Sequence, residues 1–184
     1  MRLETERLIL REWNLNDIDD MVEGLNNFNI SKNLTTPFPY DKECAKNFIE
    51  KHLKHNEFDY TFAIELKEEN KVIGGMGLTK KTIDDKYKGG IWLNERYTSK
   101  GYGSEAFITR ANFAFDVLGL EEIENGFFEY NEKSFKMQRK IGYKIVGKTT
   151  NFCPALKKEV VEVVTKLTKN EFYDKFNWGV VWVK

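Results

Sequence analysis

The sequence has few of the residues that mark disulfide-rich, metal-binding or membrane proteins. It contains two cysteines and two histidines in 184 residues, and no apolar run approaches the roughly 20 residues that span a bilayer. Cys44 and Cys153 lie far apart without metal-ligand spacing. His52 and His55 lie on one expected helix without an acidic or cysteine partner. We therefore expect free thiols, no metal site and, since the charged N-terminal stretch lacks a signal core, a cytoplasmic protein.

Neither sign of charge is in excess, because 29 lysines and arginines balance 29 aspartates and glutamates. Without a net field, the chain is not expected to recruit nucleic acid or an anionic membrane. Its length suits a single domain over residues 1–184, with a core that needs no disulfide or metal. Monomer and homodimer both remain open.

Hydrophobic periodicity and turn residues predict a chain that alternates between strands and helices. Strands are expected at residues 7–12, 60–66, 71–80, 87–93, 122–129, 143–148 and 158–167. A first helix, capped by Asn14 or Asn16, is expected to carry Ile18, Met21, Val22 and Leu25 on one side. Further helices are expected over residues 41–55, 102–118 and 131–141. An antiparallel start followed by strand and helix in turn indicates an α/β fold with a mixed sheet and helices on both faces.

Two segments fall outside this alternation. Residues 26–40, which contain Pro37 and Pro39, predict an irregular arm before the second helix. Residues 177–184 place Trp178 and Trp182 among valines, a pattern that suits an added edge strand or a dimer contact.

The most informative segment joins a strand ending at Leu93 to a long helix through Lys100-Gly101-Tyr102-Gly103-Ser104. The two glycines let the backbone approach a bound group closely. The helix that follows aims unpaired N–H groups and the positive end of its dipole at the turn. This arrangement predicts an anion site suited to phosphate, although Lys100 and Ser104 could instead be plain surface residues.

The helix after this turn has two faces in the sequence. Polar residues recur at Glu105, Thr109, Asn112 and Asp116, and apolar residues occupy the opposite side. We expect the apolar side to pack on the sheet and the polar stripe to lie opposite it.

A second motif links the chain to a known family. The segment Asn131-Glu132-Lys133-Ser134, followed by Lys140-Ile141-Gly142-Tyr143, resembles the Asn-x-x-Ser and Lys-x-Gly-(Phe/Tyr) pattern of the GNAT acetyltransferases. Residues 3–11 and 166–172 look like the first strand and the end of the branch that acetylates ribosomal-protein N-termini. The resemblance, over residues 3–176, implies a GNAT-like α/β fold. Its central sheet is mixed, mostly antiparallel and splayed in the middle, and acetyl-CoA is the cosubstrate.

In this family the pantetheine arm of acetyl-CoA lies between two splayed strands, which here would be residues 87–93 and 122–129. The resemblance implies that backbone groups at Trp92 and Leu93 pair with the pantetheine amides. An N–H near Leu93 would then polarise the thioester carbonyl. The Trp92 side chain by itself would suit the core better.

The resemblance also assigns the glycine turn to the cofactor's pyrophosphate. The family's loop begins with Gln or Arg, where this chain has Thr98. Binding is still expected, because the cradle consists of N–H groups at Gly101, Tyr102, Gly103 and Ser104, with charge added by Lys100.

The second motif supplies the candidate acid. Many GNAT enzymes place a tyrosine where this chain has Gln138, which cannot protonate a departing thiolate. In the branch resembled here, a serine lies near the cofactor sulfur, so the role passes to Ser134. Asn131 is assigned to the cofactor and could also cap the helix, and a surface serine is the alternative for Ser134.

The candidate base is less defined. Roughly one in ten to one in five α-amino groups is neutral at pH 7, against fewer than ~1 in 1,000 lysines, so an N-terminal acceptor needs little help. Glu129, at the end of a strand, is our candidate, with Glu95 and Glu162 as alternatives. Each could instead be an exposed glutamate.

Together these features predict a cytoplasmic, acetyl-CoA-dependent N-acetyltransferase that needs no metal. Transfer would be direct from the thioester to a primary amine, with a protein or peptide N-terminus as acceptor. An open groove would favour that acceptor, and a deep acidic pocket would favour an antibiotic, polyamine or amino acid. The departures at Thr98 and Gln138 keep open a module that binds acyl-CoA without turnover.

Overall fold

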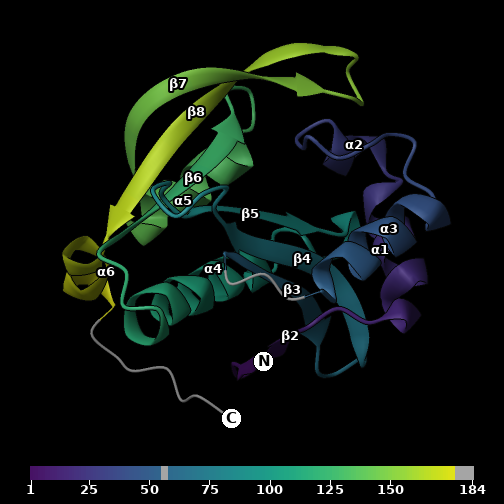
Figure 1. Ribbon diagram of the computed structural model, residues 1–184, viewed down its shortest axis with the longest axis horizontal. Coiled ribbons are helices and arrows are strands. Elements are labelled where there is room, and N and C mark those ends of the chain that lie inside the picture. Colours follow the sequence, from purple (N-terminus) through teal and green to yellow (C-terminus); the bar gives the residue numbers. More distant parts are fainter. Residues whose placement is uncertain (55–57, 177–184) are drawn as a thin grey trace.

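The computed structural model describes residues 1–54 and 58–176, which form an eight-stranded sheet with helices on both faces (Figure 1). The strand order is β1-β2-β3-β4-β5-β6-β8-β7, and within the described sheet the only parallel neighbours are β5 and β6. The strands are β1 (Arg2–Glu4), β2 (Leu8–Arg11), β3 (Asp59–Leu66), β4 (Lys71–Thr79), β5 (Lys88–Leu93), β6 (Glu122–Phe128), β7 (Lys144–Cys153) and β8 (Lys158–Thr168). The predicted mixed, mostly antiparallel sheet is confirmed.

One face of the sheet carries the larger core. Helix α4 (Tyr102–Asn112), α5 (Glu132–Ile141) and α6 (Lys169–Lys175) pack there. Phe107 and Ala111 of α4 are fully buried, as are Ile123 of β6 and Phe172 of α6. This face therefore holds α4, and with it the glycine turn at its start, rigidly against the sheet.

The opposite face carries α1 (Ile18–Leu25) and α3 (Lys42–His52) over β3 and β4. Asp41 caps α3, and its side chain accepts a hydrogen bond of 2.8 Å from the Cys44 amide. Asn14 caps the short 3₁₀ turn Leu15–Asp17 that leads into α1, whereas α1 itself follows Asp17 without a side-chain cap, so the predicted cap lies one turn before the helix.

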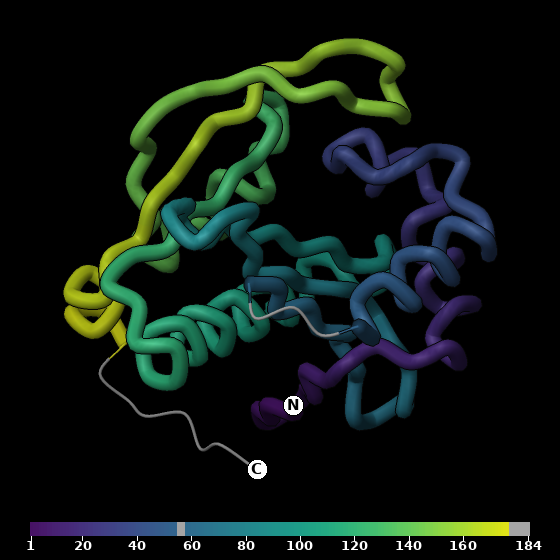
Figure 2. The backbone as a smooth tube through the Cα atoms, viewed as in Figure 1, coloured from purple at the N-terminus to yellow at the C-terminus, as the bar shows by residue number. Residues whose placement is uncertain are grey.

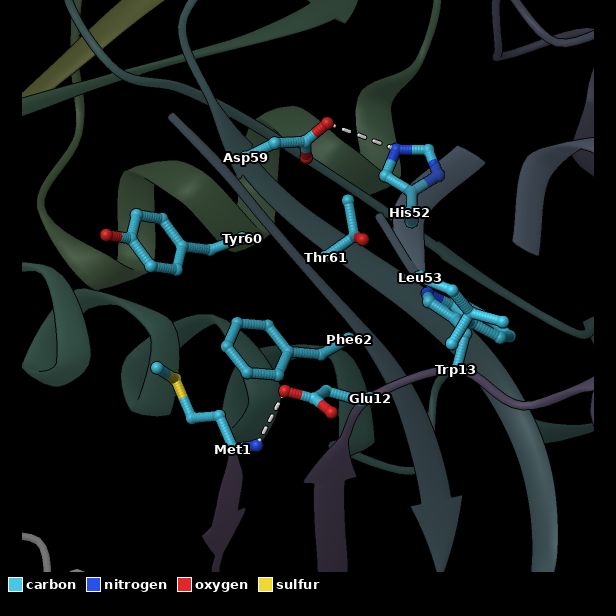
Figure 3. Close-up of a pocket in the computed structure, with 9 residues that line it drawn as sticks. All are labelled: Met1, Glu12, Trp13, His52, Leu53, Asp59, Tyr60, Thr61 and Phe62. Carbon is cyan, nitrogen blue, oxygen red and sulfur yellow. Dashed lines mark hydrogen bonds and ion pairs between the residues drawn. The ribbon is translucent and has the colours of Figure 1, made fainter. Parts of the chain in front are cut away.

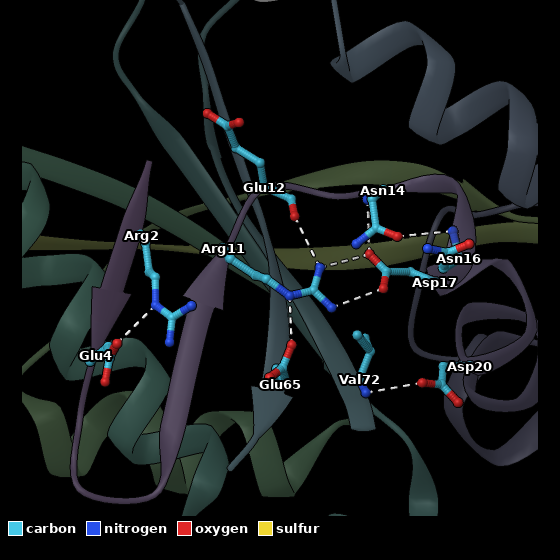
Figure 4. A network of polar contacts seen from close by, with 10 residues as sticks. All are labelled: Arg2, Glu4, Arg11, Glu12, Asn14, Asn16, Asp17, Asp20, Glu65 and Val72. Atoms are coloured by element: carbon cyan, nitrogen blue, oxygen red, sulfur yellow. Dashed lines mark hydrogen bonds and ion pairs between the residues drawn. The ribbon is translucent and has the colours of Figure 1, made fainter. Parts of the chain in front are cut away.

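A partly buried ion network fixes the start of α1 to the sheet (Figure 4). Arg11 on β2 donates two bonds of 2.9 Å to Asp17 and one of 2.6 Å to Glu65 on β3. These carboxylates, Asp17 first, raise the pKa of Arg11 above its ordinary value. Asp20 of α1 accepts from the Val72 amide of β4 at 3.0 Å, so α1 is tied to three strands.

The arm, residues 26–40, contains one short helix, α2 (Phe28–Ser31), and reaches the far end of the sheet. Figures 1 and 2 show the tip of the β7–β8 hairpin arching over to it. The Lys32 carbonyl accepts a bond from the Tyr130 hydroxyl and lies 3.4 Å from Cys153 Sγ. Burial raises the pKa of Tyr130 to about 12, which keeps this donor protonated. The arm is therefore held against the last strands of the sheet.

Several predictions on local structure were wrong or incomplete. The polar stripe of α4 is partly buried, and there Thr109 Oγ1 and Asn112 Nδ2 donate to the carbonyls of Glu105 and Ile108 at 2.9 and 3.1 Å. Strand β7 runs to Cys153, five residues beyond its predicted end, and β1 and α6 were not predicted. The helix predicted over residues 102–118 is α-helical to Asn112 and then continues as a π-helical segment, Phe113–Val117. Residues 177–184 lie outside the described residues.

Candidate active site

The site is built around a fork in the sheet between β5 and β6. These strands pair only at Lys88 with Glu124 and at Gly89 with Asn125. Beyond that point β5 continues to Leu93 and β6 to Phe128 without facing one another. Backbone N–H and C=O groups along both inner edges therefore lack the cross-strand partners that an ordinary parallel pair would provide.

The glycine turn lies beyond the open end of β5. Ser99 and Gly101 have positive φ angles of 63° and 88°, and α4 begins at Tyr102 without a side-chain cap. The N–H groups of Tyr102, Gly103 and Ser104 have no acceptor within the helix, since they belong to its first turn. With the helix dipole behind them, these donors suit a phosphate, so the residues present fit the pyrophosphate of acetyl-CoA.

Arg7, the residue just before β2, contacts this turn and the first turn of α4. It donates to Glu105 of α4 at 2.7 Å and to the Lys100 carbonyl at 3.1 Å, and its guanidinium lies 4.5 Å from the Tyr102 ring centroid. Our sequence reasoning missed this role, because nothing in local spacing connects Arg7 to a turn more than ninety positions away.

The two glycines of the turn do different work. Gly101 adopts a left-handed conformation that glycine tolerates and β-branched residues do not. A Cβ on Gly103 would lie 3.3 Å from Met137 Sδ and 3.4 Å from Leu93 Cδ1. The close approach at Gly103 is therefore to protein side chains, and that glycine lets α4 pack on β5 and α5.

The candidate residues on β5 face both sides of the sheet. The Trp92 side chain stacks on Trp13, with ring centroids 6.5 Å apart, so it belongs to the α1–α3 core. Leu93 packs on the α4 face. Both residues pair with β4, at Gly75 and Gly74, so the other edge of β5 faces the fork. Pairing of that edge with pantetheine stays a prediction.

Helix α5 starts beside the end of β6. The Asn131 side chain accepts from the Ser134 amide at 3.1 Å and so caps the helix. Gln138 is buried, donates to Ser134 Oγ at 3.0 Å, and accepts from Thr165 Oγ1 at 2.6 Å. Because the Ser134 oxygen accepts this bond, its own hydrogen can be given to another group.

The three candidate carboxylates lie in three different places. Glu129 is exposed and forms an ion pair with Lys148. Glu95 follows β5, lines a pocket with Asn94 and Arg96, and accepts bonds from the arm's Asn27 and Asn29. Glu162, on β8, is 12% exposed and paired with Lys88 of β5. The catalytic role given to Glu129 stays a prediction.

Arg110 is a residue at the fork that we did not anticipate. It is completely buried within α4, and a Cβ on Gly89 would fall 2.1 Å from its Nη1. Its guanidinium donates hydrogen bonds of 3.1 to 3.3 Å to Gly77 O, Gly90 O, Asn125 Oδ1 and Tyr143 Oη. Arg110 therefore joins β4, β5 and β6 where the last two part.

A further pocket lies away from the fork, beside the first half of β3 (Figure 3). Trp13, Tyr60 and Phe62 are among its lining residues. His52 contacts Asp59 at 3.2 Å there, and its Nδ1 lies 2.6 Å from the Phe48 carbonyl. His52 is thus a structural residue of the helix end, and His55 lies outside the described residues.

The comparisons with known proteins decide the family. The model of the acetyltransferase (GNAT) domain family matches residues 7–144. The chain belongs to the GNAT acetyltransferases. It is 28% identical over 147 residues to the uncharacterized N-acetyltransferase YnaD of Bacillus subtilis (strain 168), a match that covers 80% of this chain and 85% of that protein.

Solved GNAT structures share the fold. The ribosomal-protein-S5-alanine acetyltransferase from Vibrio fischeri matches with a TM-score of 0.76 and 19% identity, over 94% of this chain and 98% of that one. Spermidine N-acetyltransferase from Vibrio cholerae, solved with CoA and spermine, matches with a TM-score of 0.78 and 16% identity, over 91% and 99%. The protein is thus an N-acetyltransferase of a family that uses acetyl-CoA, and these neighbours do not fix its acceptor.

Two structural findings bear on other classes of protein. Within residues 1–54 and 58–176, no three or more His, Cys, Asp or Glu side chains gather in a way that could hold a metal ion. In the same part of the chain, no helix is long and apolar enough to cross a membrane.

Proposed function

We propose that this GNAT enzyme acetylates the α-amino group at a protein or peptide N-terminus. The observation that carries the proposal is that each candidate carboxylate around the fork already has a partner within the protein. Glu129 and Glu162 are each paired with a lysine, and Glu95 is bonded to two asparagines of the arm. A polyamine needs several carboxylates for its several charges, whereas an α-amino group needs one contact and is partly neutral already.

The arm supports the same choice of acceptor. Asn27 and Asn29 connect it to Glu95 beyond β5, while its Lys32 carbonyl meets Tyr130 beyond β6. It therefore spans the open end of the fork. Amide and hydroxyl side chains there can bond peptide groups without a fixed charge.

The chemistry follows from the residues on either side of the fork. The donors at the start of α4 hold the cosubstrate's phosphates, and the amine attacks the thioester carbon directly. As the carbon–sulfur bond breaks, the thiolate takes the hydrogen of Ser134, which the bond from Gln138 leaves free to be given.

Thiol release tests the function directly. The purified protein is incubated with acetyl-CoA and either peptides with free N-termini or a panel of small amines, including spermidine. We expect the peptides to give the highest kcat/KM. Preference for a small amine would refute the acceptor class, and no release with any amine would indicate an acyl-CoA-binding module.

Ser134→Ala should lower kcat by about tenfold or more and leave acetyl-CoA affinity within error, because the departing thiolate loses its proton donor. Steady-state kinetics and calorimetry measure the two quantities. Thr165→Val is the matched control, since it removes the hydrogen bond that the Gln138 side chain accepts and keeps the serine hydroxyl. If both variants lose kcat equally, Ser134 acts only by positioning Gln138.

Exchanging Thr35-Thr36-Pro37-Phe38 for a Gly-Ser segment should raise KM for the amine and leave acetyl-CoA binding unchanged. The exchange removes the contact between Phe38 and Phe28, whose ring centroids lie 6.0 Å apart, and so loosens the arm. The two parameters are read from initial rates and calorimetry. A fall in acetyl-CoA affinity at constant amine KM would assign the arm to the cofactor side.

A further inference from the structure

Glu162 reaches across the sheet to the point where the fork begins. It starts on β8, opposite Phe128 of β6, and its two oxygens bond Lys88 of β5 at 3.0 Å. Asn151 of β7 donates to the same carboxylate. Lys88 forms the first of the two β5–β6 pairs, so the carboxylate is bound at the paired end of the fork.

The Glu162 side chain can lie across β6 because residue 126 is a glycine. A Cβ on Gly126 would fall 1.8 Å from Glu162 Oε1 and 2.6 Å from its Cδ, so the carboxyl group lies directly over this glycine. Gly126 follows Asn125, the last residue of β6 that pairs with β5. On the other strand, a Cβ on Gly90 would have no atom of residues 1–54 or 58–176 within 4 Å. Two glycines therefore flank the fork, one covered by the carboxylate and one open.

The carboxylate lies on the arm's side of the sheet. Val160, two residues earlier on β8, packs with Phe128 and Cys153, and Cys153 contacts the arm's carbonyls. Arg110 approaches Gly89 from α4, on the opposite face. Alternation along β5 then puts Lys88 and Gly90 on the arm's side with Glu162.

We propose that Glu162 is the carboxylate that receives the acceptor amine. This rests on the proposed function, because phosphates held beyond the open end of β5 direct the thioester end of the cosubstrate toward the closed end of the fork. An ammonium group over Gly90 gives one proton to Glu162, and its nitrogen then attacks the thioester carbon. As the carbon–sulfur bond breaks, Ser134 gives its hydrogen to the thiolate, and the second proton of the nitrogen replaces that hydrogen on Ser134. Amide and thiol are then the products, and the proton taken by Glu162 is released to solvent.

Lys88 sets which amines fit. It already balances the charge of Glu162, and its side chain is 40% exposed, so an incoming cation must share the carboxylate with it. A singly charged, weakly basic amine tolerates this arrangement better than a polyamine, whose further charges Lys88 repels. The pair therefore acts as a filter for α-amino groups.

The experiment compares five variants with whichever amine the wild-type enzyme turns over best, so it does not depend on that amine being a peptide. Glu162→Gln should raise amine KM or lower kcat/KM by about tenfold or more, with acetyl-CoA affinity within error. Gly126→Ala should act in the same direction, since it displaces the carboxylate without removing it. Glu159→Gln, an exposed glutamate on the same strand, should match wild type.

Lys88→Met separates a contact with the amine from a purely structural ion pair. If Glu162 receives the amine, removing its lysine should lower amine KM and improve spermidine relative to a monoamine. Equal losses in Lys88→Met and Glu162→Gln would show that the pair only holds the strands, and would overturn the proposal. A larger loss of kcat/KM in Glu129→Gln than in Glu162→Gln would also overturn it.

Discussion

Gly101→Val is expected to weaken acetyl-CoA binding about 30-fold, which corresponds to about 2 kcal/mol. Gly101 has a φ of 88°, and valine in that conformation is a strained outlier. The turn would have to change shape, and a side chain there would also press on Arg7 Nη2, 3.2 Å from the Cβ position. Losing one or two charge-assisted hydrogen bonds to phosphate accounts for the expected effect.

Calorimetric titration with acetyl-CoA measures this loss, and Gly119→Val is its control. Gly119 has a φ of 66° and is exposed, and no atom in the described part of the chain lies within 4 Å of its Cβ position. It therefore carries a similar backbone strain at the far end of the helix. We expect it to lose stability and keep its affinity. A folded Gly101→Val protein with wild-type affinity would move the phosphate site elsewhere.

Arg110→Met is expected to lower the free energy of unfolding by about 3 kcal/mol or more. Methionine can occupy the space beside the Phe107 ring, over which the guanidinium lies at 4.2 Å. It cannot donate hydrogen bonds, so two strand carbonyls, an asparagine oxygen and the Tyr143 hydroxyl lose a donor in a buried site. Each unsatisfied buried group costs about 1–3 kcal/mol. The four acceptors lie close together, so we expect a total below the sum of their separate costs.

Urea unfolding of Arg110→Met and of Arg139→Met measures the difference. Arg139 is exposed on α5, and its replacement should change stability by less than about 0.5 kcal/mol. Equal stabilities for the two variants would mean that the cost of burying the Arg110 charge cancels the bonds it makes. The fork would then be held by the strands alone.

The sequence predicted the parts of this fold that depend on local patterns. The runs that became β3, β4, β5 and β8 were recognised from apolar residues between turn signals, and α3 from its position after Asp41. The end of β7 was missed because Thr149 to Cys153 is largely polar and exposed, as expected of a strand at the edge of the sheet. Local periodicity carries no information on which strand will lie at an edge.

The candidate site likewise has parts that depend on local sequence and parts that depend on the folded chain. The glycine turn and the Asn131–Ser134 motif are contiguous in sequence, so their positions could be predicted. Arg7, Arg110 and the Glu162–Lys88 pair act on residues that are distant in the chain and meet only when the sheet forms. No spacing rule connects them. Our proposal of Glu162 among the three glutamates rests on the burial and partners of each.

The most direct test of the account locates the acetyl group on a peptide that carries both a free α-amino group and an internal lysine. The protein is incubated with acetyl-CoA and this peptide, and tandem mass spectrometry identifies the modified nitrogen. We predict acetylation of the α-amino group, with the lysine unmodified and spermidine a poor competitor. Acetylation of the lysine alone, or of spermidine in preference to the peptide, would contradict it.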